Sequence, residues 1–306
     1  MRYFEALATT LHFGRAAEMV HVTQPALSTQ IMEMEKHLGV TLIERTRNNT
    51  LLTEKGREVL AHVRSILAGV DGLEMAARRS TGTLEGLLRL GMIPTVAPYL
   101  VPKMVPHLRA AHPLIEIELK EAVTDRLIAD LADGRLDAVV AALPVEADNV
   151  MERHLFTDTF YMAMADNDSD VLVSPLTETH VDPNRLLLLE EGHCLRDQAL
   201  AVCKAASKRS LINFGATSMT TLLQMVSHDM GMTLIPEMAI ETEAGRTAIR
   251  IVPFAEPRPS RDIGLIWRRS NTRRGDMEAL ATAIIESRAT VPVADAEAGM
   301  AAHLRS

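Results

Sequence analysis

The two cysteines, Cys194 and Cys203, are the residues of this 306-residue chain whose type and spacing best suit a chemical role. Both lie on one short amphipathic segment. An apolar run of strand length, residues 185–189, precedes this segment, and Gly192 interrupts the run. Residues 195–206 then have the apolar spacing of a helix. The pattern predicts that Cys194 lies at a strand-to-helix turn, at or just before the helix N-terminus.

A cysteine at a helix N-terminus has a lowered pKa, because the unpaired N–H groups and the helix dipole stabilise its thiolate. Arg196 and, when protonated, His193 are expected to add positive charge near Cys194. We therefore expect Cys194 to be mostly thiolate near neutral pH. The thiolate is the form that attacks a peroxide oxygen.

The separation of the two cysteines decides what a bond between them would require. Cys203 lies nine positions after Cys194, so on an intact helix their Cα atoms would be ~13 Å apart and on nearly opposite faces. A disulfide requires Cα atoms within ~7 Å. A disulfide here would therefore have to unwind the helix and would act as a switch. Two small buried side chains without redox chemistry are the other interpretation that the residues leave open.

Residues 192–199, with the sequence GHCLRDQA, resemble the peroxide-sensing loop found among the LysR-type transcriptional regulators. The second cysteine at the matching distance extends the resemblance. It implies that Cys194 is the peroxidatic thiolate, which hydrogen peroxide oxidises to a sulfenic acid, and that Cys203 resolves this acid to an intramolecular disulfide. It also implies that the intervening helix unwinds and that the spacing of the DNA-binding domains changes.

The resemblance continues in three polar residues outside the cysteine loop. It implies that the hydroxyl of Thr95, in segment 91–102, orients peroxide, that Thr124 is a second polar contact, and that Arg261 stabilises the thiolate. The implied peroxide pocket comprises Thr95, Thr124, His193, Arg196, Asp197 and Arg261. Both threonines precede helical stretches, so we expect them to serve also as helix N-caps. By residue type alone, Arg261 could equally be a solvated cation at a strand edge.

Length, composition and cysteine count restrict the class of protein. A chain of 306 residues is expected to form two or three domains, and 3% aromatic residues with 17 methionines predict aliphatic cores. Two cysteines argue against a secreted disulfide framework. We find no signal-peptide pattern and no apolar run near the ~18 residues of a membrane span, which predicts a soluble cytoplasmic protein without membrane contact. No metal-ligand spacing or phosphate loop stands out, so no metal and no cofactor are expected.

The formal net charge of −8 is unevenly distributed along the chain. Residues 1–80 contain 10 Lys and Arg against 9 Asp and Glu, whereas the remainder contains 22 against 31. Any affinity for DNA must therefore depend on a few well-placed cations and helix N-termini, because the region lacks a strongly basic field.

Residues 1–56 have the pattern of a winged helix-turn-helix that is mostly α-helical. Apolar stripes predict two short helices and a third over residues 24–38, and strand-like segments at 42–45 and 49–52 predict a β-wing. Residues 16–46 resemble the LysR-type DNA-binding domain, although the spacing also fits an ordinary three-helix core with solvated polar residues. Gln suits adenine, Ser and Thr reach phosphates or bases, and Arg suits phosphates, so the residues expected to contact double-stranded DNA are Thr23, Gln24, Pro25, Ser28, Thr29, Arg45 and Arg47.

Residues 57–79 are predicted to form a long linker helix that dimerises the protein. Its apolar residues recur in steps of four and three, as in a two-stranded coiled coil: Val59, Val63, Ile66, Val70, Leu73 and Ala77. A dimer would let two recognition helices read paired half-sites, and the family resemblance implies a homotetramer. A single amphipathic helix packed on its own domain is the alternative. Residues 80–86 are predicted to be a hinge.

Residues 87–290 alternate strand and helix patterns, which predicts an α/β domain with an open, largely parallel sheet. The pattern resembles the two-subdomain, periplasmic-binding-protein-like effector domain of LysR-type regulators. Subdomain I would comprise about 87–156 and 262–290, and subdomain II about 157–261. A ligand is expected in the cleft between them. Residues 291–306 are predicted to be a loose tail.

These resemblances imply a DNA-binding transcriptional regulator, not an enzyme, that senses hydrogen peroxide and controls oxidative-stress genes together with RNA polymerase. One alternative is a LysR-type regulator that responds to a small metabolite in the effector-domain cleft and has inert cysteines. Another is a thiol peroxidase. A peroxidase is disfavoured because the chain has no second thiol pair for recycling and because residues 1–80 would have no role.

Overall fold

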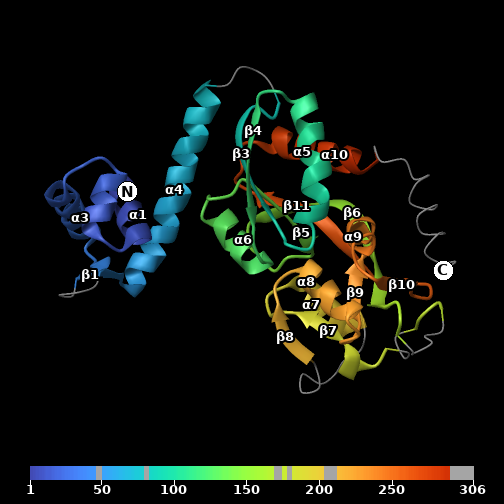
Figure 1. Cartoon of the computed structure of the whole chain (residues 1–306). Helices are drawn as coiled ribbons and strands as arrows, with labels where there is room; N and C mark the ends of the chain where they lie inside the picture. The colour runs from blue at the N-terminus through green and yellow to red at the C-terminus, as the bar shows by residue number, and fades with distance from the viewer. Residues whose placement is uncertain (46–49, 79–82, 169–173, 178–180, 203–211, 290–306) are drawn as a thin grey trace. The chain divides into compact units, whose positions relative to one another are not determined.

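The computed structural model describes residues 1–289 apart from 46–49, 79–82, 169–173, 178–180 and 203–211 (Figure 1). Cys203, Arg47 and the predicted tail at 291–306 lie outside the described residues. The chain forms two compact units: Met1–Thr81 with Asp130–Leu136, and Gly82–Ala129 with Asp137–Ser306.

The N-terminal unit contains the predicted helices and wing. Helices α1 (Arg2–Thr10), α2 (Phe13–Met19) and α3 (Gln24–Leu38) are followed by an antiparallel hairpin of β1 (Ile43–Arg45) and β2 (Thr50–Leu52). The predicted apolar stripes face inward and form a core that includes Phe4, Leu7, Leu27 and Ile31. The sequence pattern was sufficient here because each helix buries one continuous stripe.

Short polar contacts fix the ends of these elements. The Thr23 hydroxyl accepts a hydrogen bond of 3.4 Å from the backbone N–H of Ala26, so Thr23 caps α3. Glu35, near the end of α3, accepts hydrogen bonds from the backbone N–H groups of Leu42 and Ile43 at 2.7 and 3.0 Å. A single carboxylate therefore anchors the wing to the helix that precedes it.

Helix α4 (Glu54–Arg78) begins earlier than the sequence analysis predicted. The Thr53 hydroxyl accepts a hydrogen bond of 2.8 Å from the N–H of Gly56, which starts the helix at that point. The predicted heptad stripe has two parts. Val63 is buried in the core of the N-terminal unit, whereas Ile66 and Leu73 are 48% and 70% exposed. Only the second part of the stripe is thus available to a partner helix.

The rest of the chain is an α/β region, with the element bounds that follow. The strands are β3 (Gly86–Met92), β4 (Ile115–Glu121), β5 (Ala138–Leu143), β6 (Val150–Ala165), β7 (Leu187–Leu189), β8 (Ile212–Ala216), β9 (Thr233–Pro236), β10 (Ile249–Pro253) and β11 (Ser260–Arg268). The helices are α5 (Ala97–Ala111), α6 (Thr124–Ala132), α7 (Cys194–Val202), α8 (Met219–Ser227), α9 (Glu237–Ala244) and α10 (Arg274–Ala289), with a 3₁₀ turn at Pro183–Arg185.

The main sheet is mixed, which corrects the expectation of a largely parallel sheet. Its order is β10-β6-β11-β5-β3-β4, and β9 also pairs with β6. Strand β3 is parallel to β4 and β5, but β6 is antiparallel to β9, β10 and β11. Strands β6 and β10 and helix α9 were not predicted from the sequence. Strand β6 is 16 residues long and changes from an alternating burial pattern to a fully buried one, so no single periodicity describes it.

Strand β11 pairs along its whole length with the first part of β6, from Ser260 opposite Thr159 to Arg268 opposite Val150. Both therefore run across the predicted boundary between the two subdomains. A second core surrounds the buried half of β6 and includes side chains from α7, α8 and α9.

Among the residues that the structure describes, no helix is long and apolar enough to cross a membrane.

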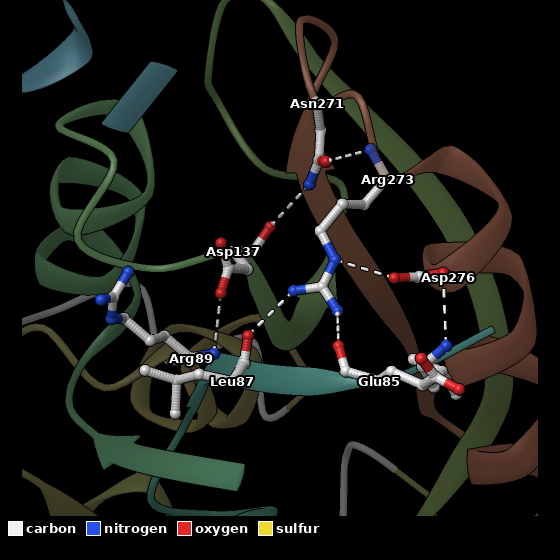
Figure 2. Close-up of polar contacts among 8 residues, drawn as sticks. Glu85, Leu87, Arg89, Asp137, Asn271, Arg273 and Asp276 are labelled. Atoms are coloured by element: carbon white, nitrogen blue, oxygen red, sulfur yellow. Dashed lines mark hydrogen bonds and ion pairs between the residues drawn. The ribbon is translucent and has the colours of Figure 1, made fainter. Parts of the chain in front are cut away.

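Part of the predicted hinge is held by the side chain of Arg273 (Figure 2). The Arg273 guanidinium donates hydrogen bonds to the carbonyls of Leu87 and Glu85 at 2.9 and 3.2 Å, and to the Asp276 carboxylate at 2.8 Å. Asp276 in turn accepts the backbone N–H of the buried Leu84 at 3.3 Å. These hydrogen bonds join the chain that enters β3 to the start of α10.

Candidate functional site

Cys194 is the first residue of α7, immediately after the turn that follows β7. Gly192 has a φ of 94°, a backbone conformation that side chains with a Cβ rarely adopt, so glycine permits this sharp turn. The backbone N–H groups of Cys194 and Leu195 act on the thiol and favour its ionised form. The predicted placement at a helix N-terminus is confirmed.

Cys194 is one of the residues that line a small pocket built by three separate segments. These segments are the β3–α5 loop, the start of α6 and the turn before α7, and the lining residues are Ile93, Pro94, Thr95, Val123, Thr124, Gly192, His193 and Cys194. The space between these residues is too narrow to admit a water molecule. Thr95, Thr124, His193 and Cys194, four residues of the predicted site, are therefore neighbours although they are widely separated in the sequence.

Arg261 is the residue that fixes Thr95. Its guanidinium donates hydrogen bonds to the Thr95 hydroxyl at 2.8 Å and to the Thr95 carbonyl at 3.2 Å. It also donates from Nε and Nη2 to one oxygen of Asp158, at 3.0 and 2.9 Å. All three side chains are buried. Arg261 is thus an ordered part of the site, and the alternative of a solvated cation at a strand edge is wrong.

The pKa of Cys194 is raised, which corrects the expectation of a lowered value. Burial of the thiol raises its pKa, and this effect outweighs the Arg261 guanidinium and the helix N-terminus, both of which lower it. The charge of Asp197, an exposed residue in the first turn of α7, raises the pKa further. The thiol is therefore the main form at rest.

Neither His193 nor Arg196 supplies the positive charge that was expected beside Cys194. His193 is buried, and this burial lowers its pKa, so its imidazole is neutral near pH 7 and supplies no positive charge. Arg196 is also buried and donates a hydrogen bond of 2.9 Å to the carbonyl of Leu189, at the end of β7. The contact of Arg196 supports the turn that carries Cys194. The positive charge that acts on the thiol is that of Arg261.

Neither threonine of the pocket caps a helix, in contrast to our expectation. The N-cap residue of α5 is Val96, and Thr95 accepts from Arg261 instead. The buried hydroxyl of Thr124 has no hydrogen-bond partner among the residues that the structure describes. Leaving a buried hydroxyl unpaired costs roughly 1–3 kcal/mol. The arrangement therefore suits a small polar ligand that bonds to Thr124 when it enters the pocket.

Asp158 is the site residue that the sequence analysis missed. It lies on β6, is buried, and receives the two bonds from Arg261 described above. The available signal was a lone acidic residue next to the apolar run FYMAMA at 160–165. A buried charge in such a strand requires a partner of opposite sign.

Among the described residues, no group of three or more His, Cys, Asp or Glu side chains could hold a metal ion.

In the N-terminal unit, the expected DNA-contacting residues gather at the first turns of α3. Gln24, Pro25 and Thr29 are exposed, and Ser28 is half-buried. The exposed Thr23 caps the helix, and the Thr29 hydroxyl donates to the carbonyl of Pro25 at 3.0 Å. The backbone of Arg45 belongs to β1, while Arg47 lies outside the described residues. The exposed start of α3 therefore presents polar side chains on the surface of the N-terminal unit.

Two protein-family models match this chain and together cover nearly all of it. Residues 1–57 match the bacterial regulatory helix-turn-helix protein of the lysR family, and residues 81–289 match the LysR substrate binding domain. The chain belongs to the LysR family. A LysR helix-turn-helix domain followed by a LysR substrate-binding domain is its architecture.

Two individual LysR-family proteins are similar to this chain over most of its length. The chain is 39% identical over 284 residues, 93% of both chains, to the DNA-binding transcriptional dual regulator OxyR of Escherichia coli K12. It is 37% identical to the hydrogen peroxide-inducible genes activator of Haemophilus influenzae, over 93% of this chain and 94% of that protein.

Two solved structures of LysR-family proteins are also similar. A full-length OxyR variant from Pseudomonas aeruginosa has a TM-score of 0.76 and 33% identity, covering 93% of this chain and 96% of that one. A mutant OxyR of Corynebacterium glutamicum with hydrogen peroxide bound has a TM-score of 0.68 and 31% identity, covering 98% of this chain and 94% of that one.

Proposed function

We propose that this LysR-family protein is a transcriptional regulator that senses hydrogen peroxide through Cys194 and controls oxidative-stress genes. The observation that carries the proposal is the pocket that Cys194 lines together with Thr95 and Thr124, two residues with hydroxyl groups. Arg261 fixes the Thr95 hydroxyl, and the buried Thr124 hydroxyl has no hydrogen-bond partner among the described residues, so both can bond to a small polar molecule. The named functions of the relatives support this proposal.

The first chemical step is oxidation of the Cys194 thiol. Its sulfur attacks one peroxide oxygen, the O–O bond breaks, and the thiol proton leaves with the other oxygen as water, which gives a sulfenic acid. The Thr95 hydroxyl accepts from Arg261 and has no acceptor of its own among the described residues, so its proton can be donated to peroxide. Arg261 stabilises the thiolate as it forms.

The second step forms the switch. The Cys203 thiol attacks the sulfenic sulfur and a water molecule leaves, giving a Cys194–Cys203 disulfide. Because Cys194 begins α7, the disulfide requires this helix to unwind. Peroxide entry also requires movement, because the space in the pocket consists of narrow gaps instead of a chamber. The narrowness disfavours a larger metabolite as the signal.

The remaining parts carry the signal to DNA. The start of α3 reads double-stranded DNA, and the exposed part of α4 joins two chains into a dimer, with a homotetramer as the full assembly. The effector region is of the two-subdomain, periplasmic-binding-protein-like kind, with β6 and β11 as its crossing strands. The protein acts in the cytoplasm with RNA polymerase as a regulator, without enzymatic turnover.

DNase footprinting on the promoter of a peroxide-induced gene tests this proposal. The protected region should change when the wild-type protein is treated with hydrogen peroxide and return after reduction. Cys194→Ser and Cys203→Ser should each bind DNA but give one unchanging footprint. Identical footprints of treated and untreated wild type would reject the proposal and favour a metabolite signal.

A further inference from the structure

Helix α9 is connected to the loop that lines the pocket at both of its ends. At its start, the backbone N–H of Met238 donates to Asp158 at 3.2 Å, and the other oxygen of Asp158 holds Arg261, which binds Thr95. Near its end, Glu243 accepts a hydrogen bond of 2.9 Å from the hydroxyl of Tyr99. Both series of hydrogen bonds therefore end within residues 95–99.

Thr95 and Tyr99 are four residues apart and flank the start of α5. Tyr99 and Glu243 are 6% and 5% exposed, so their hydrogen bond is shielded from water. A bond to a buried carboxylate is stronger than one at the surface. The same oxygen of Glu243 also accepts from the Thr220 hydroxyl at 3.0 Å, which ties α8 to α9.

The Tyr99 hydroxyl remains a hydrogen-bond donor over the whole physiological pH range. Burial and the charge of Glu243 both raise the pKa of Tyr99 above its usual range, so the phenol keeps its proton at every physiological pH. The contact between Tyr99 and Glu243 therefore persists while the Cys194 thiol ionises.

We propose that Glu243, acting through Tyr99, and Asp158, acting through Arg261, are positioning residues that hold the Thr95 hydroxyl for reaction of peroxide with Cys194. Glu243 lies on α9, whereas Asp158 lies on β6 and accepts the backbone N–H of Met238 at the start of α9. The inference rests on the proposed peroxide chemistry. A loop held at one end only would let Thr95 drift, and a displacement of about 1 Å lowers the rate of an oriented reaction by up to ~100-fold.

The test measures two second-order rate constants for Cys194 in the full-length Cys203→Ser protein, one with hydrogen peroxide and one with methyl methanethiosulfonate. The second reagent also requires the thiolate but does not need an aligned hydroxyl. Tyr99→Phe keeps the ring and removes only the hydroxyl. We expect it to slow the peroxide reaction by about tenfold and leave the other reaction unchanged.

Two further variants separate positioning from folding. Glu243→Gln retains an acceptor for Tyr99 and should stay within about twofold of the parent protein. Lys103→Met removes an exposed ion pair of 3.0 Å between α5 and α9, with Glu241, and is the matched control with no expected change.

The inference is overturned if Tyr99→Phe reacts with peroxide at the parent rate. It is equally overturned if both reagents slow together, because that pattern indicates general loss of structure. A parent protein that is itself inert to peroxide removes the proposed function and this inference with it.

Discussion

The guanidinium of Arg261 and the hydroxyl of Thr95 lie 2.8 Å apart although 166 residues separate them in the sequence. The bond brings a strand from the end of the domain to the loop that follows its first strand. It orients the hydroxyl beside Cys194 and places a positive charge where a thiolate forms.

The oxidation of Cys194 should accelerate with pH across the neutral range. The pKa of the thiol is raised, mainly by burial, so the reactive thiolate is the minor form at pH 7 and its fraction grows about tenfold per pH unit below the pKa. Stopped-flow measurement of the peroxide reaction from pH 6 to 8 should show this slope. A rate that is flat over the same range would indicate a thiolate already formed at pH 6.

Arg261→Met should destabilise the protein by roughly 3–5 kcal/mol, because it leaves the Asp158 carboxylate buried without its partner. Arg261→Met combined with Asp158→Asn should recover much of this loss, since no unpaired charge remains. Urea unfolding of both variants and of wild type measures the difference. Equal stabilities of the single and double variants would contradict a coupled pair.

Thr124→Val should separate stability from reactivity. The change removes a buried hydroxyl without a partner among the described residues, so the free energy of unfolding should rise by about 1 kcal/mol. The peroxide reaction should slow by about tenfold, because one donor to the reacting oxygens is lost. Thr124→Ser keeps the hydroxyl and is the control. A Thr124→Val protein that is less stable and fully reactive would show that Thr124 has no role in the site.

Leu73→Glu should weaken dimerisation, because this residue of α4 is 70% exposed and continues the apolar stripe of Ile66 and Val70. A charge at the seam of two paired helices is strongly unfavourable. Ala61→Glu, on the opposite face of the same helix, is the matched control. Sedimentation velocity should show smaller particles for Leu73→Glu alone. The same distribution for both variants would assign the dimer contact to another surface.

The sequence predicted those features that depend on neighbouring residues. The stripe in α3, the wing and the placement of Cys194 after Gly192 are local patterns, and each matches the structure. Strand β6 and the role of Asp158 depend on pairing with β11, more than 90 residues away, which no local periodicity encodes.

The electrostatics of the site were harder to predict than its location. A helix N-terminus indicates a lowered pKa, but burial decides the sign for Cys194, and burial is set by segments distant in the sequence. Arg196 is likewise near Cys194 in sequence, yet its guanidinium binds the carbonyl of Leu189. The helix caps expected at Thr95 and Thr124 were wrong, because the Thr95 hydroxyl accepts from Arg261 and the Thr124 hydroxyl has no partner among the described residues.

The most direct test of the central claim is a thiol count on fully reduced protein after addition of stoichiometric hydrogen peroxide. The count should fall from two to zero within seconds, with both thiols lost together, and peptide mapping should find one Cys194–Cys203 link. Two thiols that survive excess peroxide would contradict the account, and the signal would then have to be sought among small metabolites.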